Sequence, residues 1–181
     1  MILKHKVLIS GIAVAVIGAL AIFAMPEWFA QGGATAAKDV RGDKAPDFVL
    51  ADVQGAKFRL NDHLGKPVLL VFGTTWCPSC REEIPHLKDI YASYAKKGLI
   101  MVNIDIQESR DKVSRYADKN ELPYRLLLDE DGAVSEMYGI RGVPSMILLD
   151  EAGKIIGGQR FIDPLLANLF KGKKSVVDRP I

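Results

Sequence analysis

Cys77 and Cys80 stand three positions apart and are the only cysteines in this chain of 181 residues. They follow the apolar run Val68–Phe72 and begin a segment with a helical pattern. A dithiol at this spacing can cycle between two thiols and an internal disulfide, and it can also supply two ligands of a metal site. Because both cysteines belong to one CxxC, the chain has no separate disulfide framework. We therefore expect a redox-active dithiol.

The position of the two cysteines between a strand and a helix predicts different roles for them. Cys77 lies at the expected helix start, where free backbone N–H groups and the helix dipole favour a thiolate, the form that attacks disulfides. Pro78 suits the first helical position, because its missing N–H costs no hydrogen bond there. We expect Cys77 to be the exposed nucleophile and Cys80, one turn further in, to be the buried resolving thiol.

The N-terminal segment has the pattern of a membrane anchor. The stretch from Val7 to Met25 carries no charged residue, and Lys4 and Lys6 precede it. Its length suits a single transmembrane helix and exceeds the apolar region of a typical signal peptide. The preceding lysines predict a cytoplasmic N-terminus and an extracytoplasmic position for the rest of the chain. The alternative is a signal peptide that is cleaved near residues 34–36, which would release the protein outside the cell.

Composition divides the chain into four parts and excludes one class of partner. We expect an anchor or signal segment over 1–30, a Gly/Ala/Thr-rich linker over 31–39, a single globular domain over 40–172 and a polar tail over 173–181. The formal net charge is +2, and no basic stripe interleaves with aromatic residues. Nucleic-acid binding therefore has no support.

The apolar periodicity of the domain predicts the element order β-β-β-α-β-α-β-α-β-β-α, an α/β fold with a mixed sheet. A continuous apolar run before the cysteines is typical of a strand buried on both faces. The first two strands form a β-hairpin, and the last helix is capped by Asp163 with Pro164 at its first position. The expected strands are 47–50, 57–60, 67–72, 99–104, 124–128, 145–149 and 154–159, and the expected helices are 81–97, 109–120, 133–138 and one from Asp163.

Four stretches of the chain together resemble the thioredoxin superfamily, and within it the membrane-anchored TlpA/ResA-like thiol-disulfide oxidoreductases. The stretches are residues 45–48, 69–85, 138–144 and 147–150, and the resemblance covers about 43–170. It implies a thioredoxin-like fold with helices flanking the mixed central sheet, an N-terminal β-hairpin and a strand-helix insertion between Leu122 and Gly142. It also implies an extracytoplasmic enzyme that needs no cofactor and reduces protein disulfides.

The resemblance also implies partners. The substrates would be protein thiols or disulfides, and in relatives of this kind they are often the cysteines of apocytochrome c, which links such enzymes to cytochrome c maturation. A membrane protein would supply the electrons. The opposite direction, in which the dithiol inserts disulfides, uses the same residues.

The same resemblance assigns roles to residues around the dithiol. Pro144 matches the family's cis-proline, and the backbone of Val143 would pair with an extended substrate segment. Trp76 and Pro78 would complete the substrate groove. Glu83 matches an acidic residue of ResA-like proteins, and at one helical turn from Cys80 it would accept that thiol's proton.

The resemblance also points to one departure from thioredoxin. Thioredoxin itself carries a buried aspartate in the strand before the motif, and Val71 occupies that position here. We therefore expect that proton acceptor to be absent, so that Glu83 would stand in for it.

Two other functions, metal delivery and peroxide reduction, are also compatible with the sequence. Copper-delivery proteins share the fold and pair two thiols with a distant histidine, but their cysteines stand further apart, and the domain offers only His63 and His86. Zinc would need four ligands, so we predict no metal site. Peroxiredoxins also share the fold; Thr74 fits their motif, whereas Leu70 stands where they have proline.

Overall fold

The computed structural model describes residues 42–158 and 162–172. These residues fall within one compact unit, Val40–Ile181. The predicted membrane segment, the linker and the tail over 173–181 lie outside the described residues. Within the two described ranges, no helix combines the length and the apolar character that crossing a bilayer requires.

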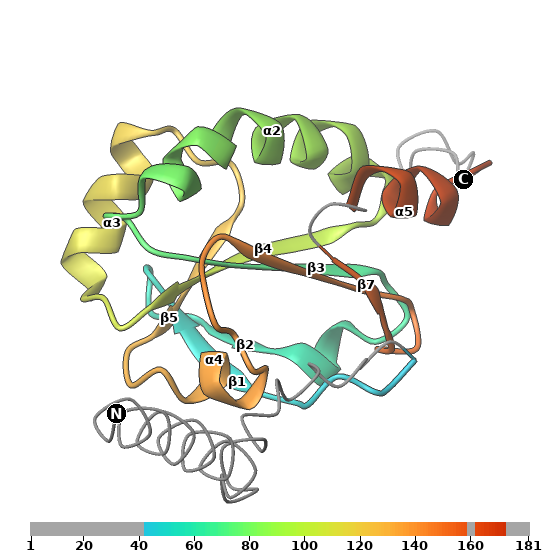
Figure 1. Cartoon of the computed structure of the whole chain (residues 1–181), viewed down its shortest axis with the longest axis horizontal. Helices are drawn as coiled ribbons and strands as arrows, with labels where there is room; N and C mark the ends of the chain where they lie inside the picture. Colours follow the sequence, from blue (N-terminus) through green and yellow to red (C-terminus); the bar gives the residue numbers. More distant parts are fainter. Residues whose placement is uncertain (1–41, 159–161, 173–181) are drawn as a thin grey trace, which may run out of the picture. The chain divides into compact units, whose positions relative to one another are not determined.

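A seven-stranded mixed sheet forms the centre of the domain, in the order β2-β1-β5-β4-β3-β6-β7 (Figure 1). The three central strands β5, β4 and β3 are parallel, and the flanking strands β1 and β6 run antiparallel to them. The predicted element order and the mixed sheet are confirmed. The strands are β1 (Val49–Asp52), β2 (Lys57–Arg59), β3 (Val68–Gly73), β4 (Ile100–Ile106), β5 (Arg125–Asp129), β6 (Ser145–Leu149) and β7 (Ile155–Gly157).

Helices cover both faces of the sheet, because the side chains of the central strands alternate between two apolar layers. All six residues of β3 are buried. Leu69 and Val71 pack in one layer with Leu87 and Leu166 of the helices, and Leu70 and Phe72 pack in the other layer with Val134. Figure 1 shows α2 and α5 on one face and α4 on the other. The helices are α2 (Pro78–Tyr94), α3 (Arg110–Lys119), α4 (Ala133–Met137) and α5 (Ile162–Leu169).

Several element boundaries differ from the sequence prediction. Helix α2 begins at Pro78, as the motif predicted, but it ends at Tyr94, before the predicted end at Lys97. Strand β4 extends to Ile106, two residues beyond the predicted end, because its pairing with β5 continues to that point. Helix α5 begins at Ile162, whose buried side chain joins the core, so Asp163 lies inside the first turn instead of capping it.

The β-hairpin of β1 and β2 starts two residues later than predicted. The carboxylate of Asp47 accepts hydrogen bonds from Arg59 Nε at 2.8 Å and from the Asn61 amide at 3.0 Å. These bonds, together with the hydrogen bond from the Leu60 amide to the Phe48 carbonyl at 3.1 Å, hold the chain before β1 against the end of β2.

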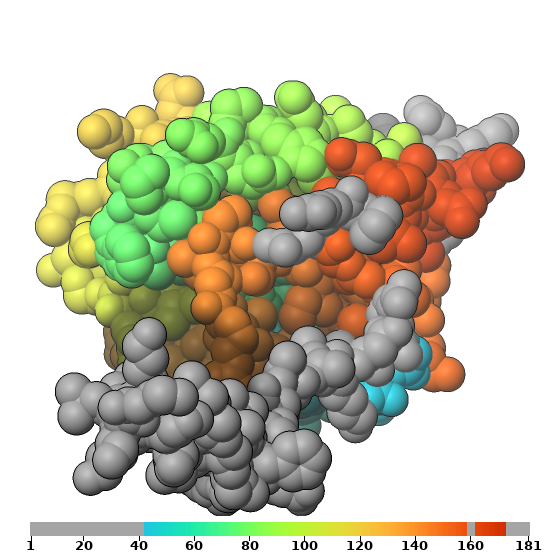
Figure 2. All heavy atoms as spheres, viewed as in Figure 1, coloured from blue at the N-terminus to red at the C-terminus, as the bar shows by residue number. Residues whose placement is uncertain are grey.

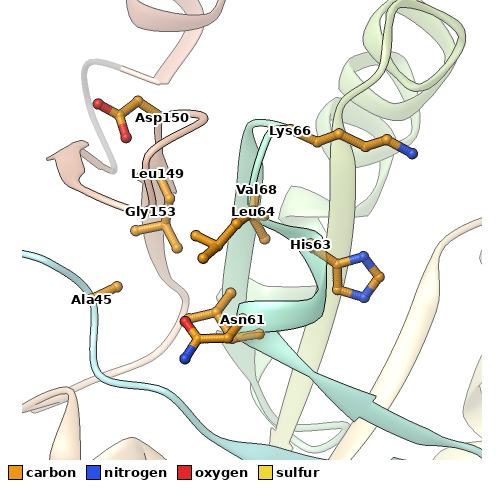
Figure 3. A pocket seen from close by; sticks show the side chains of 10 residues that line it. Ala45, Asn61, His63, Leu64, Lys66, Val68, Leu149, Asp150 and Gly153 are labelled. Carbon is orange, nitrogen blue, oxygen red and sulfur yellow. The ribbon is translucent and has the colours of Figure 1, made fainter.

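A small hollow of about 10 Å³ lies at the end of the sheet where β3 begins, opposite the end that leads to the cysteines (Figure 3). Leu64 reaches toward Gly153 there, and a Cβ at position 153 would lie 2.8 Å from the Leu64 side chain. Gly153 also has φ +76°, a conformation that glycine adopts without strain. The hollow is therefore a packing feature of the β6–β7 turn, distant from the thiols.

Candidate active site

Cys77 is the N-cap of α2, as the sequence predicted. Its backbone is extended, with φ −73° and ψ 119°, and Pro78 follows at the start of the helix. The Cys80 amide donates a hydrogen bond to Cys77 Sγ at 3.3 Å. A helix start thus directs an otherwise unpaired N–H group at this sulfur, and such a donor stabilises a thiolate.

The burial of the two thiols differs from the prediction. Cys77 was expected to be exposed, but it is only 6% exposed and Cys80 is 9% exposed. Cys77 is buried because Val143 lies against it: the thiol donates to the Val143 carbonyl, with 3.6 Å between Sγ and O. Both thiols are reduced. The two cysteines are therefore distinguished by their neighbours, since Cys77 faces the Val143 segment and Cys80 faces the sheet.

The substrate-groove residues predicted from the resemblance surround Cys77. The Val143–Pro144 peptide bond is cis, and both residues are half-buried. Trp76 and Pro78, the neighbours of Cys77 in the chain, are exposed, and Trp76 leaves 63% of its surface open to solvent. The role of these residues in substrate binding stays a prediction.

The loop that carries the cysteines is fixed by Glu108, which the sequence analysis missed. Its buried carboxylate accepts from the Thr75 amide at 2.6 Å and from the Thr75 hydroxyl at 2.7 Å, and it pairs with Lys112 at 2.6 Å. Arg81 donates to the Thr75 carbonyl at 3.2 Å. Thr75 is thus held from two sides, two residues before Cys77. No motif marks Glu108, because its partner lies 33 residues earlier in the chain.

Glu83, the predicted proton acceptor, contacts a different group in the structure. Its carboxylate is hydrogen-bonded to His86 Nδ1, and His86 Nε2 lies 2.8 Å from Asp163 Oδ1. Glu83 and then Asp163 raise the pKa of His86. This bridge joins α2 to α5, whose surfaces adjoin in Figure 2. The role of Glu83 toward Cys80 stays a prediction.

Cys80 has a buried carboxyl group as a neighbour, although the thioredoxin position lacks one, as expected. Val71 of β3 indeed supplies none, but Asp105 on the adjacent strand β4 is 1% exposed and acts electrostatically on the thiol. Burial, the hydrogen bond with Cys77 and the charges of Cys77 and Asp105 together raise the pKa of Cys80 to about 12. The signal in the sequence that could have pointed to Asp105 is its position as an acidic residue within the mostly apolar stretch that forms β4.

The histidines considered for a metal site lie elsewhere. His63 stacks on Phe58, with ring centroids 4.4 Å apart, and Figure 3 shows its ring directed away from Gly153. His86 belongs to the bridge between α2 and α5. Over the described residues, no group of three or more His, Cys, Asp or Glu side chains is arranged to hold a metal ion.

Glu108→Gln should destabilise the protein. Burial alone would raise the pKa of Glu108, but the hydrogen bonds from Lys112 and Thr75 outweigh it and lower that pKa. The carboxylate therefore stabilises the fold at pH values above the usual pKa of glutamate. This contribution is lost as the pH falls through the lowered pKa of Glu108. We expect the variant to lose about 1–3 kcal/mol of unfolding free energy at neutral pH, with a smaller loss in acid. Urea unfolding of the full chain at several pH values measures both.

The matched control is Glu82→Gln, because Glu82 is an exposed glutamate on α2. Its unfolding free energy should stay within about 0.5 kcal/mol of the parent value. Equal stability of the Glu108 and Glu82 variants at neutral pH would contradict the role of Glu108.

Comparison with known proteins places this site in a family. The AhpC/TSA family model matches residues 41–157. The thiol-disulfide oxidoreductase ResA of Geobacillus thermodenitrificans is 35% identical over 114 residues, which are 63% of this chain and 66% of that protein, just under two thirds of its length.

Solved structures agree with this placement. The thioredoxin domain of a thiol-disulfide oxidoreductase from Bacteroides vulgatus is 28% identical with a TM-score of 0.65, covering 74% of this chain and 98% of that one. The peroxidoxin BcpB from Mycobacterium tuberculosis is 26% identical with a TM-score of 0.64, over 74% and 98% of the two chains. The fold is thus thioredoxin-like, and the chain belongs to the AhpC/TSA family.

Proposed function

We propose that this protein is an extracytoplasmic thiol-disulfide oxidoreductase that reduces protein disulfides with the Cys77–Cys80 dithiol. The observation that carries the proposal is the setting of Cys77, whose sulfur accepts a helix-start N–H and lies 3.6 Å from the Val143 carbonyl. The similarity to thiol-disulfide oxidoreductases supports the same chemistry.

The reaction needs only the two thiols and the substrate. The Cys77 thiolate attacks one sulfur of a substrate disulfide, forming a mixed disulfide and releasing the first substrate thiol. Cys80 then loses its proton and attacks Cys77 Sγ, which closes the Cys77–Cys80 disulfide and releases the second substrate thiol. Two electrons and two protons pass from the protein to the substrate, and a reductant must later reopen the disulfide.

The surroundings of Cys77 fit an extended protein substrate. The Val143 carbonyl lies beside the sulfur, just before the cis bond to Pro144, and the exposed Trp76 precedes Cys77 in the chain. A substrate strand that runs past the Val143 backbone would bring its disulfide to Cys77, while the indole contacts the flanking side chains. Small thiols would not need such a surface.

Serine substitutions separate the two steps of this reaction. Cys77→Ser should abolish reduction of a peptide disulfide, because it removes the attacking sulfur. Cys80→Ser should form the mixed disulfide and accumulate it, because nothing resolves it. Mass spectrometry of acid-quenched mixtures measures both species. If the Cys80 variant captures no substrate and Cys77 does not react with an alkylating reagent, the proposed function is wrong.

The direction of electron flow follows from the redox potential. A reductant that receives electrons from a membrane donor and passes them to apocytochrome c should have a potential nearer that of thioredoxin, about −270 mV, than that of the oxidant DsbA, about −120 mV. Equilibration of the full chain with glutathione or dithiothreitol buffers measures it. A value near −120 mV would reassign the protein to disulfide insertion, with the same thiols.

We infer that Val7–Met25 anchors the protein in the membrane and places the domain outside the cytoplasm. The support is the uncharged length of this segment and the lysines that precede it. The full chain should then remain with membranes after alkaline extraction and be degraded by protease added from the extracytoplasmic side. Release of a shortened chain into the soluble fraction would favour a cleaved signal peptide instead.

A peroxidase is the second candidate, because the chain belongs to the AhpC/TSA family and resembles a peroxidoxin. Thr74 also has a buried hydroxyl without a hydrogen-bond partner among the described residues, and it stands where the peroxidase motif has its hydroxyl residue. Leu70 replaces the proline of that motif and is fully buried. Consumption of hydrogen peroxide at a rate above that of disulfide reduction would favour this candidate.

A further inference from the structure

Asp105 is a buried carboxyl group that neither the fold nor the reaction above explains. It is 1% exposed, and its side chain accepts a hydrogen bond from Asn103 Nδ2 at 3.0 Å. The other buried aspartates have evident structural partners: Asp52 pairs with Arg125, and Asp129 accepts two amides at the start of α4. Burial of a carboxyl without such partners costs stability, so a function is the natural explanation.

The register of two parallel strands places Asp105 beneath the second cysteine. Gly73, the last residue of β3, is aligned with Asp105 of β4, and Val71 is aligned with Asn103. A Cβ at position 73 would lie 3.7 Å from both Cys80 Sγ and Asn103 Oδ1. The missing side chain of Gly73 therefore leaves an open space that Cys80 borders from α2 and the Asn103–Asp105 pair borders from β4.

This space is a small polar cavity. Its volume is about 20 Å³, and Cys80, Asp105, Asn103, Thr74 and Tyr116 are among its lining residues. A cavity of this size can hold one water molecule when polar groups surround it. The buried Thr74 hydroxyl, which has no hydrogen-bond partner among the described residues, is a further polar group in this lining. The cavity thus offers a route for a proton between the thiol and the carboxylate.

We propose that Asp105 accepts the Cys80 proton through this cavity when Cys80 resolves the mixed disulfide. The inference rests on the proposed function and deepens it, because it assigns the acid–base partner of the resolving step. It also transfers to a strand residue the role that the resemblance gave to Glu83, whose carboxylate is bonded to His86.

The titration of the neighbouring groups fits this assignment. Burial is the main factor that raises the pKa of Asp105 to about 7, with a further contribution from Glu108 and an opposing one from Asn103. A base with a pKa near 7 is matched to proton transfer at neutral pH. The other titratable groups that interact with this cluster are Cys77, Cys80, Tyr116 and Tyr124.

The resolving step balances with these groups alone. The Cys80 S–H bond breaks, its proton passes to the Asp105 carboxylate, and the Cys80 sulfur forms a bond with Cys77 Sγ. The bond between Cys77 and the substrate sulfur breaks, and the substrate leaves with the electron pair and takes up a proton. Asp105 later releases its proton to solvent or returns it when the disulfide is reduced.

The test uses the full chain and a model peptide disulfide, with acid-quenched mass spectrometry at pH values from about 5 to 9. In the parent protein the resolving rate should rise as Asp105 ionises and level off above neutral pH. Asp105→Asn should form the mixed disulfide at the parental rate, resolve it about 100-fold more slowly at pH 8, and lose the inflection near pH 7.

A second measurement tests the electrostatic interaction between Asp105 and Cys80 without any turnover of substrate. In a Cys77→Ser background, the Asp105 charge raises the pKa of Cys80, so Asp105→Asn should move the alkylation profile of Cys80 to lower pH. Asp129→Asn is the matched control, because Asp129 is equally buried but bonded to α4 amides. Even where it lowers stability, Asp129→Asn should leave the inflection and the alkylation profile in place.

The outcomes separate this inference from the proposed function. Absence of any mixed disulfide in the parent and in Cys80→Ser would refute the function itself. Normal exchange in the parent, with the same inflection and resolving rate in Asp105→Asn, would refute only the role of Asp105. Loss of the inflection in Glu83→Gln instead would return that role to Glu83.

Discussion

The parallel pairing of β3 with β4 is the constraint on which the site depends. Backbone hydrogen bonds fix six residue pairs from Val68–Ile100 to Gly73–Asp105, and the thiols, Asp105 and Glu108 all lie at or just after the ends of these two strands. β3 leads into the cysteine loop and α2, while β4 leads to Glu108. A shift of one residue in this register would turn Asp105 to the opposite face of the sheet, away from Cys80.

Three acidic residues near the dithiol have separate partners, and their partners indicate separate roles. Glu83 bonds to His86 and so belongs to the contact between α2 and α5. Glu108 holds Thr75 and pairs with Lys112, which fixes the loop before Cys77. Within the part of the chain that the structure describes, Asp105 accepts a single side-chain hydrogen bond, from the amide of Asn103, and it is the most deeply buried of the three. Burial without a countercharge is what brings its pKa toward neutrality.

The setting of Cys77 also bears on the choice between thiol exchange and peroxidase chemistry within the family. Val143, which precedes cis-Pro144, lies against the sulfur, and the exposed Trp76 is next to Cys77 in the chain. Such a surface suits a polypeptide that must be held while its disulfide is attacked. On the side of the sheet, fully buried Leu70 belongs to the apolar layer of β3 and contributes no polar group to a peroxide.

The sequence by itself determined the order of the elements, the mixed sheet and the placement of Cys77 at a helix start, because apolar periodicity and the CxxC with Pro78 are local patterns. It also pointed to Val143 and Pro144 through resemblance. Only the tertiary structure decided that both thiols are buried, that Glu108 clamps Thr75, and that Asp105 borders the Cys80 cavity. These contacts join residues far apart in the chain, and strand register and helix packing bring them together without leaving a local signal in the sequence.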